Sequence, residues 1–186
     1  SQVVLNLIRN ALDSCHENAP GGKTVGITTR MLAGEGVEIS HNGDVVRGVW
    51  RENKLVNGTG ARSFSDGQYV SGTWVNGKLE GYVVRRSLKD GYSYIGEVAA
   101  GEPHGPGVRT FPDGTVQTGT FVKGELHGVG KVVSRGNYSY EGEYSRGVPS
   151  GQGVKTCPNG DTFSGTWVNG KLRGNGTSAS SKGFTY

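Results

Sequence analysis

The octapeptide GTWVNGKL occurs twice in the chain, as Gly72–Leu79 and as Gly165–Leu172. Altered copies of the same phrase lie between and before them. Aligned on the Gly two residues before the Trp, the copies fall at Gly48, Gly72, Gly96, Gly119, Gly142 and Gly165, at intervals of 24, 24, 23, 23 and 23 residues. A fixed period in this range is typical of a repeat architecture, in which each unit packs on its neighbours.

Each unit predicts a β-hairpin. Large side chains alternate with Gly at positions two apart, as in Val46–Trp50, so they share one face of an extended strand. The intervening positions are mostly polar, which indicates a solvated opposite face. Pairs such as Asn76-Gly77 and Asp113-Gly114 suit turns with positive φ. The predicted fold is all-β: an elongated single-layer antiparallel meander of stacked β-hairpin repeats, held together by contacts between neighbours.

The unit resembles the MORN repeat (membrane occupation and recognition nexus), in its aromatic residue, Gly-x-Trp, Gly-Lys-x-His-Gly-x-Gly and Asp-Gly positions. Tyr92–Gly114 and Gly119–Lys131 fit this pattern nearly position for position. The resemblance covers residues 44–186, as six units and a truncated seventh, so we expect either that the natural protein continues beyond this sequence or that an unpaired edge strand is left at this end. Departures are few: Asn53 and Val83 replace Gly, and Val70 and Gln117 occupy aromatic positions.

Composition separates residues 1–43 from the repeats. All 16 aromatic residues (3 Trp, 8 Tyr and 5 Phe) follow residue 43, and the net charge is −1 before that point and +5 after it, which together give the +4 of the chain. The 34 Gly of 186 residues would suit a disordered chain, but disordered segments are poor in aromatic residues. We therefore expect an ordered array that needs many glycine turns.

The first 43 residues predict a cap on the array. Val4–Cys15 carries an apolar stripe at helical spacing, which indicates an amphipathic helix of about four turns that ends before Pro20. Two short strands are expected on either side of a turn at residues 33–36, or a degenerate repeat over residues 25–43. The segment NLIRNALD also resembles the N box of histidine-kinase-type ATPase domains, which would give Asn6 and Asn10 a role at Mg²⁺ and nucleotide phosphates. The family's adenine-binding Asp and its Gly-rich lid are missing, so we regard nucleotide binding as a remnant at most.

No pattern in the repeats predicts an enzyme, a cofactor or a metal. His104 and His127 hold the same turn position, about 10 Å apart in neighbouring hairpins, which is too far to share a zinc ion. Asp66, Asp90 and Asp113 recur with the period of the repeat, so we interpret them as turn residues rather than as a catalytic acid and base.

A protein-binding scaffold or adaptor is the predicted function. Aromatic residues are frequent in interaction hot spots, and the row that could contact a partner comprises Trp50, Trp74, Tyr94, Phe121, Tyr140, Tyr144, Phe163 and Trp167. The same rings could instead only hold the repeats together. The alternative is peripheral binding to anionic, phosphoinositide-type lipids, which the family name implies, through Arg85, Arg86 and Lys89.

Other partners and the location follow from weaker signals. Acidic residues interrupt the positive charge throughout, which disfavours nucleic acid. An unpaired strand at either end could support self-association through sheet edges. The two cysteines, Cys15 and Cys157, form no disulfide pattern, so we expect an intracellular, cytoplasmic protein, peripheral to a membrane if the lipid alternative holds.

Overall fold

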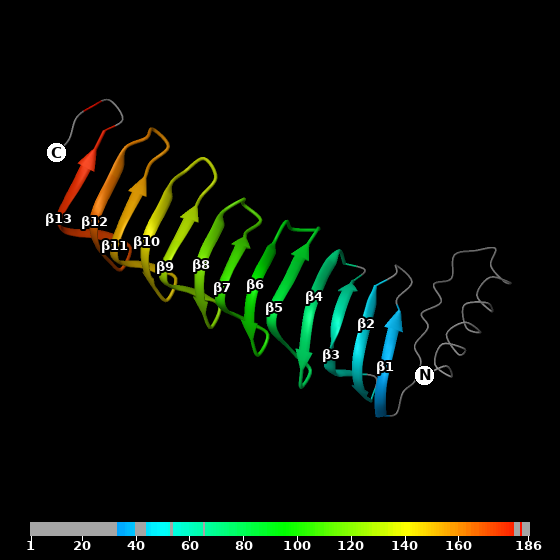
Figure 1. Cartoon of the computed structure of the whole chain (residues 1–186). Helices are drawn as coiled ribbons and strands as arrows, with labels where there is room; N and C mark the ends of the chain where they lie inside the picture. Colours follow the sequence, from blue (N-terminus) through cyan, green and yellow to red (C-terminus); the bar gives the residue numbers. More distant parts are fainter. Residues whose placement is uncertain (1–32, 40–43, 53, 65, 181–182, 184–186) are drawn as a thin grey trace, which may run out of the picture.

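The protein folds as one sheet whose strands follow each other in sequence order. The computed structural model describes residues 33–39, 44–52, 54–64, 66–180 and 183. In this part of the chain there are 13 strands, every neighbouring pair is antiparallel, and β1 and β13 lie at opposite ends of an elongated array (Figure 1). The strands are β1 (Ala33–Ile39), β2 (Val45–Arg51), β3 (Lys54–Ser63), β4 (Gln68–Val75), β5 (Lys78–Ser87), β6 (Ser93–Ala99), β7 (Glu102–Thr110), β8 (Val116–Val122), β9 (Glu125–Val133), β10 (Ser139–Ser145), β11 (Val148–Thr156), β12 (Thr162–Val168) and β13 (Lys171–Ala179).

Two-residue turns close the hairpins along one edge of the sheet. The first turn residue has a φ near +50° in all six, and where the second is a described Gly its φ is also positive, as at Asn76 (51°) and Gly77 (77°). Two successive positive φ values define the type I′ turn, whose twist matches that of the strands. The five turns that contain a described Gly also contact the preceding repeat, because the turn glycine donates a backbone hydrogen bond to it, as from Gly101 N to Leu79 O at 2.8 Å.

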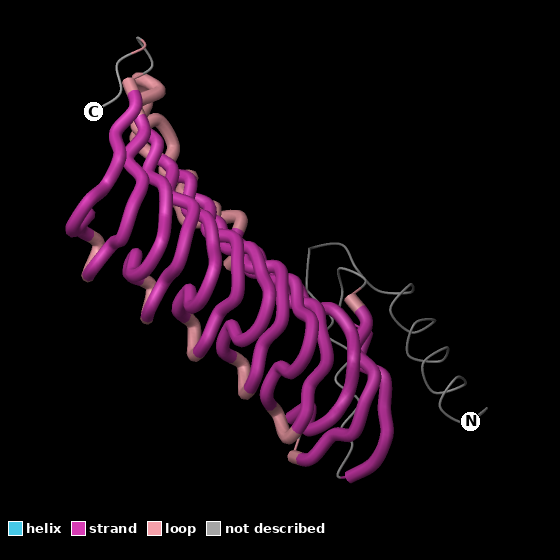
Figure 2. Tube along the Cα trace, turned by 60° about the vertical axis from the view of Figure 1, so that its left-hand side comes forward, coloured by secondary structure: helices cyan, strands magenta, loops and turns pink. Residues whose placement is uncertain are grey.

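A bulge at the same place bends every hairpin from β4 to β13. Gly96 pairs with Gly107 and Val98 with Pro103, so two residues on β6 span four on β7. The same shift recurs in the other four hairpins. Bulges bend a strand and increase its twist, and the strands are visibly curved (Figure 2). We call the side within this bend the inner face and the other side the outer face.

Glycine faces glycine across the inner face of the central strands. Every pair from β6 to β12 contains such a match, and the run is continuous: Gly96–Gly107, Gly107–Gly119, Gly119–Gly130, Gly130–Gly142, Gly142–Gly153 and Gly153–Gly165. The absence of side chains at these positions leaves a strip of bare backbone on which neighbouring rings can lie.

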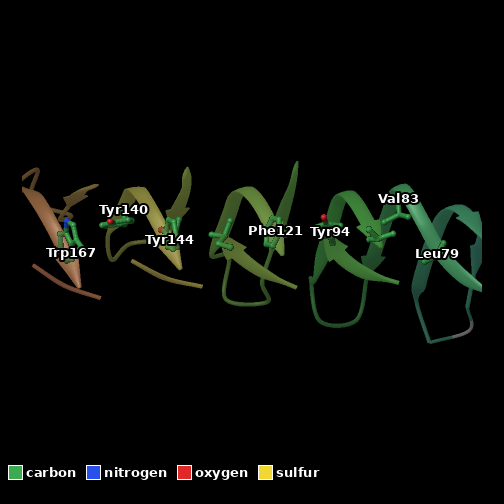
Figure 3. Close-up of a cluster of buried hydrophobic side chains, with 10 residues drawn as sticks. Leu79, Val83, Tyr94, Phe121, Tyr140, Tyr144 and Trp167 are labelled. Atoms are coloured by element: carbon green, nitrogen blue, oxygen red, sulfur yellow. The ribbon is translucent and has the colours of Figure 1, made fainter. Parts of the chain in front are cut away.

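The rings pack on this strip. A Cβ atom on Gly107 would lie 2.6 Å from the Tyr94 hydroxyl, and one on Gly153 would lie 2.1 Å from the Tyr140 hydroxyl. Both distances are far below a van der Waals contact, so any larger residue would displace the ring. Tyr140 in turn meets Tyr144 and Trp167 edge to face, with centroids 5.2 and 5.1 Å apart. Figure 3 shows these side chains in single file along the array.

One repeat replaces the ring and its glycine together. In the hairpin β4–β5, Val70 stands where Tyr94 and Tyr140 stand in later repeats, and Val83 stands where Gly107 and Gly153 do. Val83 is 1% exposed and belongs to the same hydrophobic core. The larger residue at the glycine position therefore fills the space that a smaller one at the aromatic position leaves free.

The N-terminal predictions have different outcomes. The turn expected at residues 33–36 is wrong, because these residues belong to β1 and pair with β2. Gly36 faces Gly48, which is the register that Gly107 and Gly119 repeat further along, so the sheet begins before residue 44. The expected helix over Val4–Cys15, and Tyr186 of the truncated seventh unit, lie outside the described residues.

The ring and glycine pair can be tested by exchange. Gly153→Val alone should cost about 2–3 kcal/mol of unfolding free energy, because the valine displaces Tyr140. Adding Tyr140→Val should recover about 1–2 kcal/mol of that loss, since it recreates the pair of β4–β5. Urea unfolding of both single variants and the double variant measures the coupling, and strictly additive costs would contradict this packing.

The turns provide a second test of stability. Ala100 has a φ of 53°, a conformation that asparagine adopts more easily than alanine. Ala100→Asn should therefore stabilise the protein by about 0.5–1 kcal/mol. The reciprocal Asn76→Ala, at the equivalent position with a φ of 51°, should destabilise it by a similar amount. Thermal unfolding of the pair in parallel checks the sign, and equal melting temperatures would show that the turn conformation does not limit stability.

Candidate binding surface

Most rings predicted to contact a partner are buried inside the repeat array. Six of the eight have at most 9% of their surface exposed: Trp50, Tyr94, Phe121, Tyr140, Tyr144 and Trp167. Trp74 and Phe163 are half-buried. The structure thus places the aromatic row as the floor of the inner face, and a partner lying on that face would meet the side chains around this floor.

Two of the three tyrosines of the floor are held by hydrogen bonds to the backbone. The Tyr94 hydroxyl donates to Glu97 O at 2.6 Å, and the Tyr140 hydroxyl to Glu143 O at 3.5 Å. Burial raises the pKa of Tyr94, and the neighbouring positive charges of Arg109 and Arg85 partly offset that rise. Burial also raises the pKa of Tyr144, whose hydroxyl has no hydrogen-bond partner in the described part of the protein.

A second row of side chains lies on the inner face beside the floor. Residues paired directly across strands share a face, and one unbroken series of pairs crosses the sheet from β3 to β13. In this series the second strand of a repeat carries Arg62, Arg85, Arg109 and Lys155, which we call the basic row, with Val132 and Ser178 at the two remaining positions. The sequence contains a signal for this row, because its basic residues recur at intervals of one or two repeat periods.

The basic row alternates with aromatic and apolar residues. The first strands contribute Val70, Tyr94, Gln117, Tyr140 and Phe163 to the same series. Several cations lie over rings: the Arg109 guanidinium carbon is 4.9 Å from the centroid of Phe121, and Lys155 Nζ is 4.6 Å from that of Tyr138. All four members of the basic row are partly exposed, so their charges are available to solvent or to a ligand.

The residues proposed for lipid binding do not form one cluster. Arg85 faces Tyr94 on the inner face, whereas adjacent strand residues point to opposite faces, which places Arg86 on the outer face. There Arg86 borders a hollow of about 470 Å³ with Phe64, Tyr69, Val84 and Leu88. Lys89 is exposed in the turn that follows β5. The positive charge of this segment is thus divided between two surfaces.

Three further observations concern other parts of the chain. Asn6 and Asn10 lie outside the described residues. Among the residues that the structure describes, there is no group of three or more His, Cys, Asp or Glu side chains that could hold a metal ion. The described part also has no helix with the length and apolar character needed to span a membrane.

The periodic aspartates act within their turns. Asp66, Asp90 and Asp113 each accept a hydrogen bond from the backbone N–H two residues later, at 3.0, 2.9 and 2.8 Å. Asn159 makes the same contact with Asp161 N at 3.1 Å. These backbone hydrogen bonds lower the pKa of Asp90 and Asp113, the opposite of what a general acid requires.

A family model identifies the repeat. The MORN repeat model matches residues 71–82, 94–116, 118–135, 140–162 and 163–184, which together cover more than half of the chain. The chain belongs to the MORN-repeat family. MORN repeat proteins are generally non-catalytic scaffolds, and the hairpin array of this chain is a repeat scaffold.

Other comparisons add little to this assignment. No curated protein matches the MORN-repeat chain at a significant level. Among solved structures, it is similar to the TCP domain of SAS-4 (dCPAP) of Drosophila melanogaster, solved in complex with a proline-rich motif of Ana2 (dSTIL). The likeness covers 90% of this chain and 96% of that one, with 12% identity and a TM-score of 0.42, too weak to carry an argument.

The turn aspartates predict how stability depends on pH. A carboxylate whose folded pKa is lowered stabilises the fold fully above its unfolded pKa, and that contribution is lost as the pH falls through the folded pKa. The unfolded value is about 3.8, so wild type should lose stability below that pH more steeply than the Asp90→Asn/Asp113→Asn variant. Urea midpoints measured from neutral to acidic pH test this. Glu125→Gln, which removes an exposed carboxylate outside the turn bonds, is the control and should follow wild type.

Proposed function

We propose that this MORN-repeat protein is a non-catalytic scaffold that holds a segment of a partner protein along the inner face of its sheet. The observation that carries the proposal is the series of inner-face side chains from β3 to β13, in which partly exposed residues, the four cations among them, stand beside buried rings of the floor such as Tyr94 and Tyr140. Such a surface is preformed, because the floor beneath it is packed whether or not a ligand is present.

The shape of this surface favours an elongated ligand. The series crosses ten strand spacings, and at ~4.8 Å per spacing it is about 48 Å long. Each repeat offers a similar set of contacts, so a chain segment can gain weak contacts from several repeats at once. Family membership supports a scaffold role in general, and the inner face presents partly exposed aromatic, apolar and charged groups together.

Lipid binding receives less support from this geometry. The face that carries three partly exposed arginines and a lysine lies within the bend of the strands, whereas a bilayer presents a broad surface that such a face does not follow. On the outer face, basic and acidic residues are mixed, as in the ion pair of Lys131 with Glu141 at 2.9 Å. Binding to vesicles that contain an anionic lipid, with loss of binding in Arg85→Ala, would favour the lipid alternative instead.

Two neighbouring residues allow the location of the site to be tested. Phe163 lies on the inner face and Ser164 on the outer face, because adjacent strand residues alternate. Peptides selected from a random display library for binding to wild type should form photocrosslinks when p-benzoylphenylalanine replaces Phe163. The same peptides should crosslink much less when it replaces Ser164. Failure to select any binding peptide, or stronger crosslinking from position 164, would contradict the proposed function.

A further inference from the structure

The inner and outer faces of the sheet differ in charge. On the inner face, the strand positions from β4 to β11 that share the side of Tyr94 and Tyr140 include Arg85, Arg109 and Lys155 but no Asp or Glu among the described residues. The outer face of the same strands mixes both signs, for example at Arg86, Lys131 and Glu141. From β4 to β11, the inner face therefore carries positive charge alone, and the outer face carries charges of both signs.

Three members of the basic row lack a carboxylate partner. Within the described residues, ion pairs join Arg62 to Glu38 and Lys131 to Glu141. Arg85, Arg109 and Lys155 have none, although Arg109 also donates a hydrogen bond to Gly124 O at 2.8 Å. Rings flank these cations instead of acids, as for Lys155 over Tyr138. A ring stabilises a cation without neutralising its charge, so the field of the row extends over the inner face.

The spacing of the basic row selects the form of its ligand. Successive second strands are two strand spacings apart, so neighbouring cations are separated by about 10 Å along the array. A peptide in the polyproline II conformation has three residues per turn and rises ~3.1 Å per residue, so every third side chain lies on the same side, about 9 Å from the previous one. Carboxylates at every third residue of such a segment would thus meet each cation in turn, with one gap at Val132.

We propose that the partner segment is an acidic peptide that lies across the strands in the polyproline II conformation, with carboxylates at every third residue facing Arg85, Arg109 and Lys155. This inference rests on the proposed function and adds the chemistry of the ligand. Between the carboxylates, the peptide passes over partly exposed groups of the same series, such as Val70 and Phe163.

Nucleic acid fits this row less well. A nucleic-acid strand carries a phosphate every ~3.4 Å along a duplex, which is about three times denser than the cations here. The row is also interrupted at Val132, so most phosphates of a strand would have no cation opposite them. An extended peptide can omit the acid at that position.

The test uses matched peptides and the whole chain. Fluorescein-labelled repeats of Glu-Thr-Ser, about 18 residues long, place a carboxylate every ~9 Å along one side in the polyproline II conformation. A peptide of the same composition with all its Glu at one end, and a Lys-Thr-Ser repeat, are the comparisons. In fluorescence anisotropy the Glu-Thr-Ser repeat should bind at least about threefold more tightly than the clustered peptide, the Lys peptide should not bind, and added salt should weaken binding.

Adjacent arginines provide the matched variants. Arg85→Ala and Lys155→Ala should each weaken binding of the Glu-Thr-Ser repeat by about three- to fivefold. Arg86→Ala removes the same charge from the outer face of the same strand and should leave binding unchanged. Ser178→Lys extends the basic row onto β13 beside Phe163 and should strengthen binding by about threefold. Because Ser178→Lys is expected to bind more tightly, a loss of stability in this variant could not account for the result.

The possible failures are distinct. If display-selected peptides crosslink from position 163 but the Glu-Thr-Ser repeat binds no better than the clustered peptide, the acidic spacing is wrong and the scaffold function stands. If Arg86→Ala weakens binding as much as Arg85→Ala, the inner-face assignment is wrong. Tighter binding of oligothymidylate, or of phosphatidylcholine vesicles containing phosphatidylserine, with loss in Arg85→Ala, would replace the peptide by nucleic acid or lipid.

Discussion

An aromatic ring lying on bare glycine backbone is the contact on which this structure depends. A single-layer sheet has no second layer to cover its apolar face, yet Tyr94 and Phe121 are fully buried. Burial is possible because the bulge in each hairpin bends the strands around the rings, and because glycines at positions such as 107 and 153 let the rings approach the backbone. With a larger residue in place of the glycine there is no room for the ring. Without the ring, the bent strands enclose a cavity. The hairpin β4–β5 shows that the space has to be filled rather than that a ring has to be present, since Val83 and Val70 fill it together.

This solution separates the residues that stabilise the array from those available for binding. Rings that are fully packed between repeats keep the array rigid, but they offer a ligand little surface. The accessible charged groups of the inner face occupy one position in the second strand of each repeat. At this position, long cationic side chains extend beyond the rings on which they lie. Every repeat contributes one residue at this position. Differences between the repeats at this position therefore change the charge pattern of the inner face without disturbing the packing of its floor. Arg62, Arg85, Arg109, Val132, Lys155 and Ser178 are six versions of that one position.

Much of the fold could be predicted because its causes are local. Turn position, strand alternation and repeat period depend on residues within about 23 positions of each other, and the positive φ values at Asn76 and Gly77 are those that Asn-Gly prefers. The binding surface is less predictable from the sequence. The sequence predicts partner contact for the rings because aromatic composition does not distinguish a packed ring from an exposed one. It groups Arg85 with Arg86 because they are adjacent in sequence, although adjacent strand residues point to opposite faces. The turn expected at residues 33–36 failed for a related reason: two glycines close together also mark the bulge and bare-backbone positions of a strand, as Gly105 and Gly107 do in β7.

By itself the sequence determined the repeat unit, its period and its membership of the MORN-repeat family, because these follow from spacing and local backbone preference. Only the tertiary structure decided how deeply each ring is buried, where the strands bend, and which charges share a face. Those properties arise from the register between strands. A bulge of two residues shifts this register, so it changes which side chains are neighbours in space although their order in the sequence stays the same.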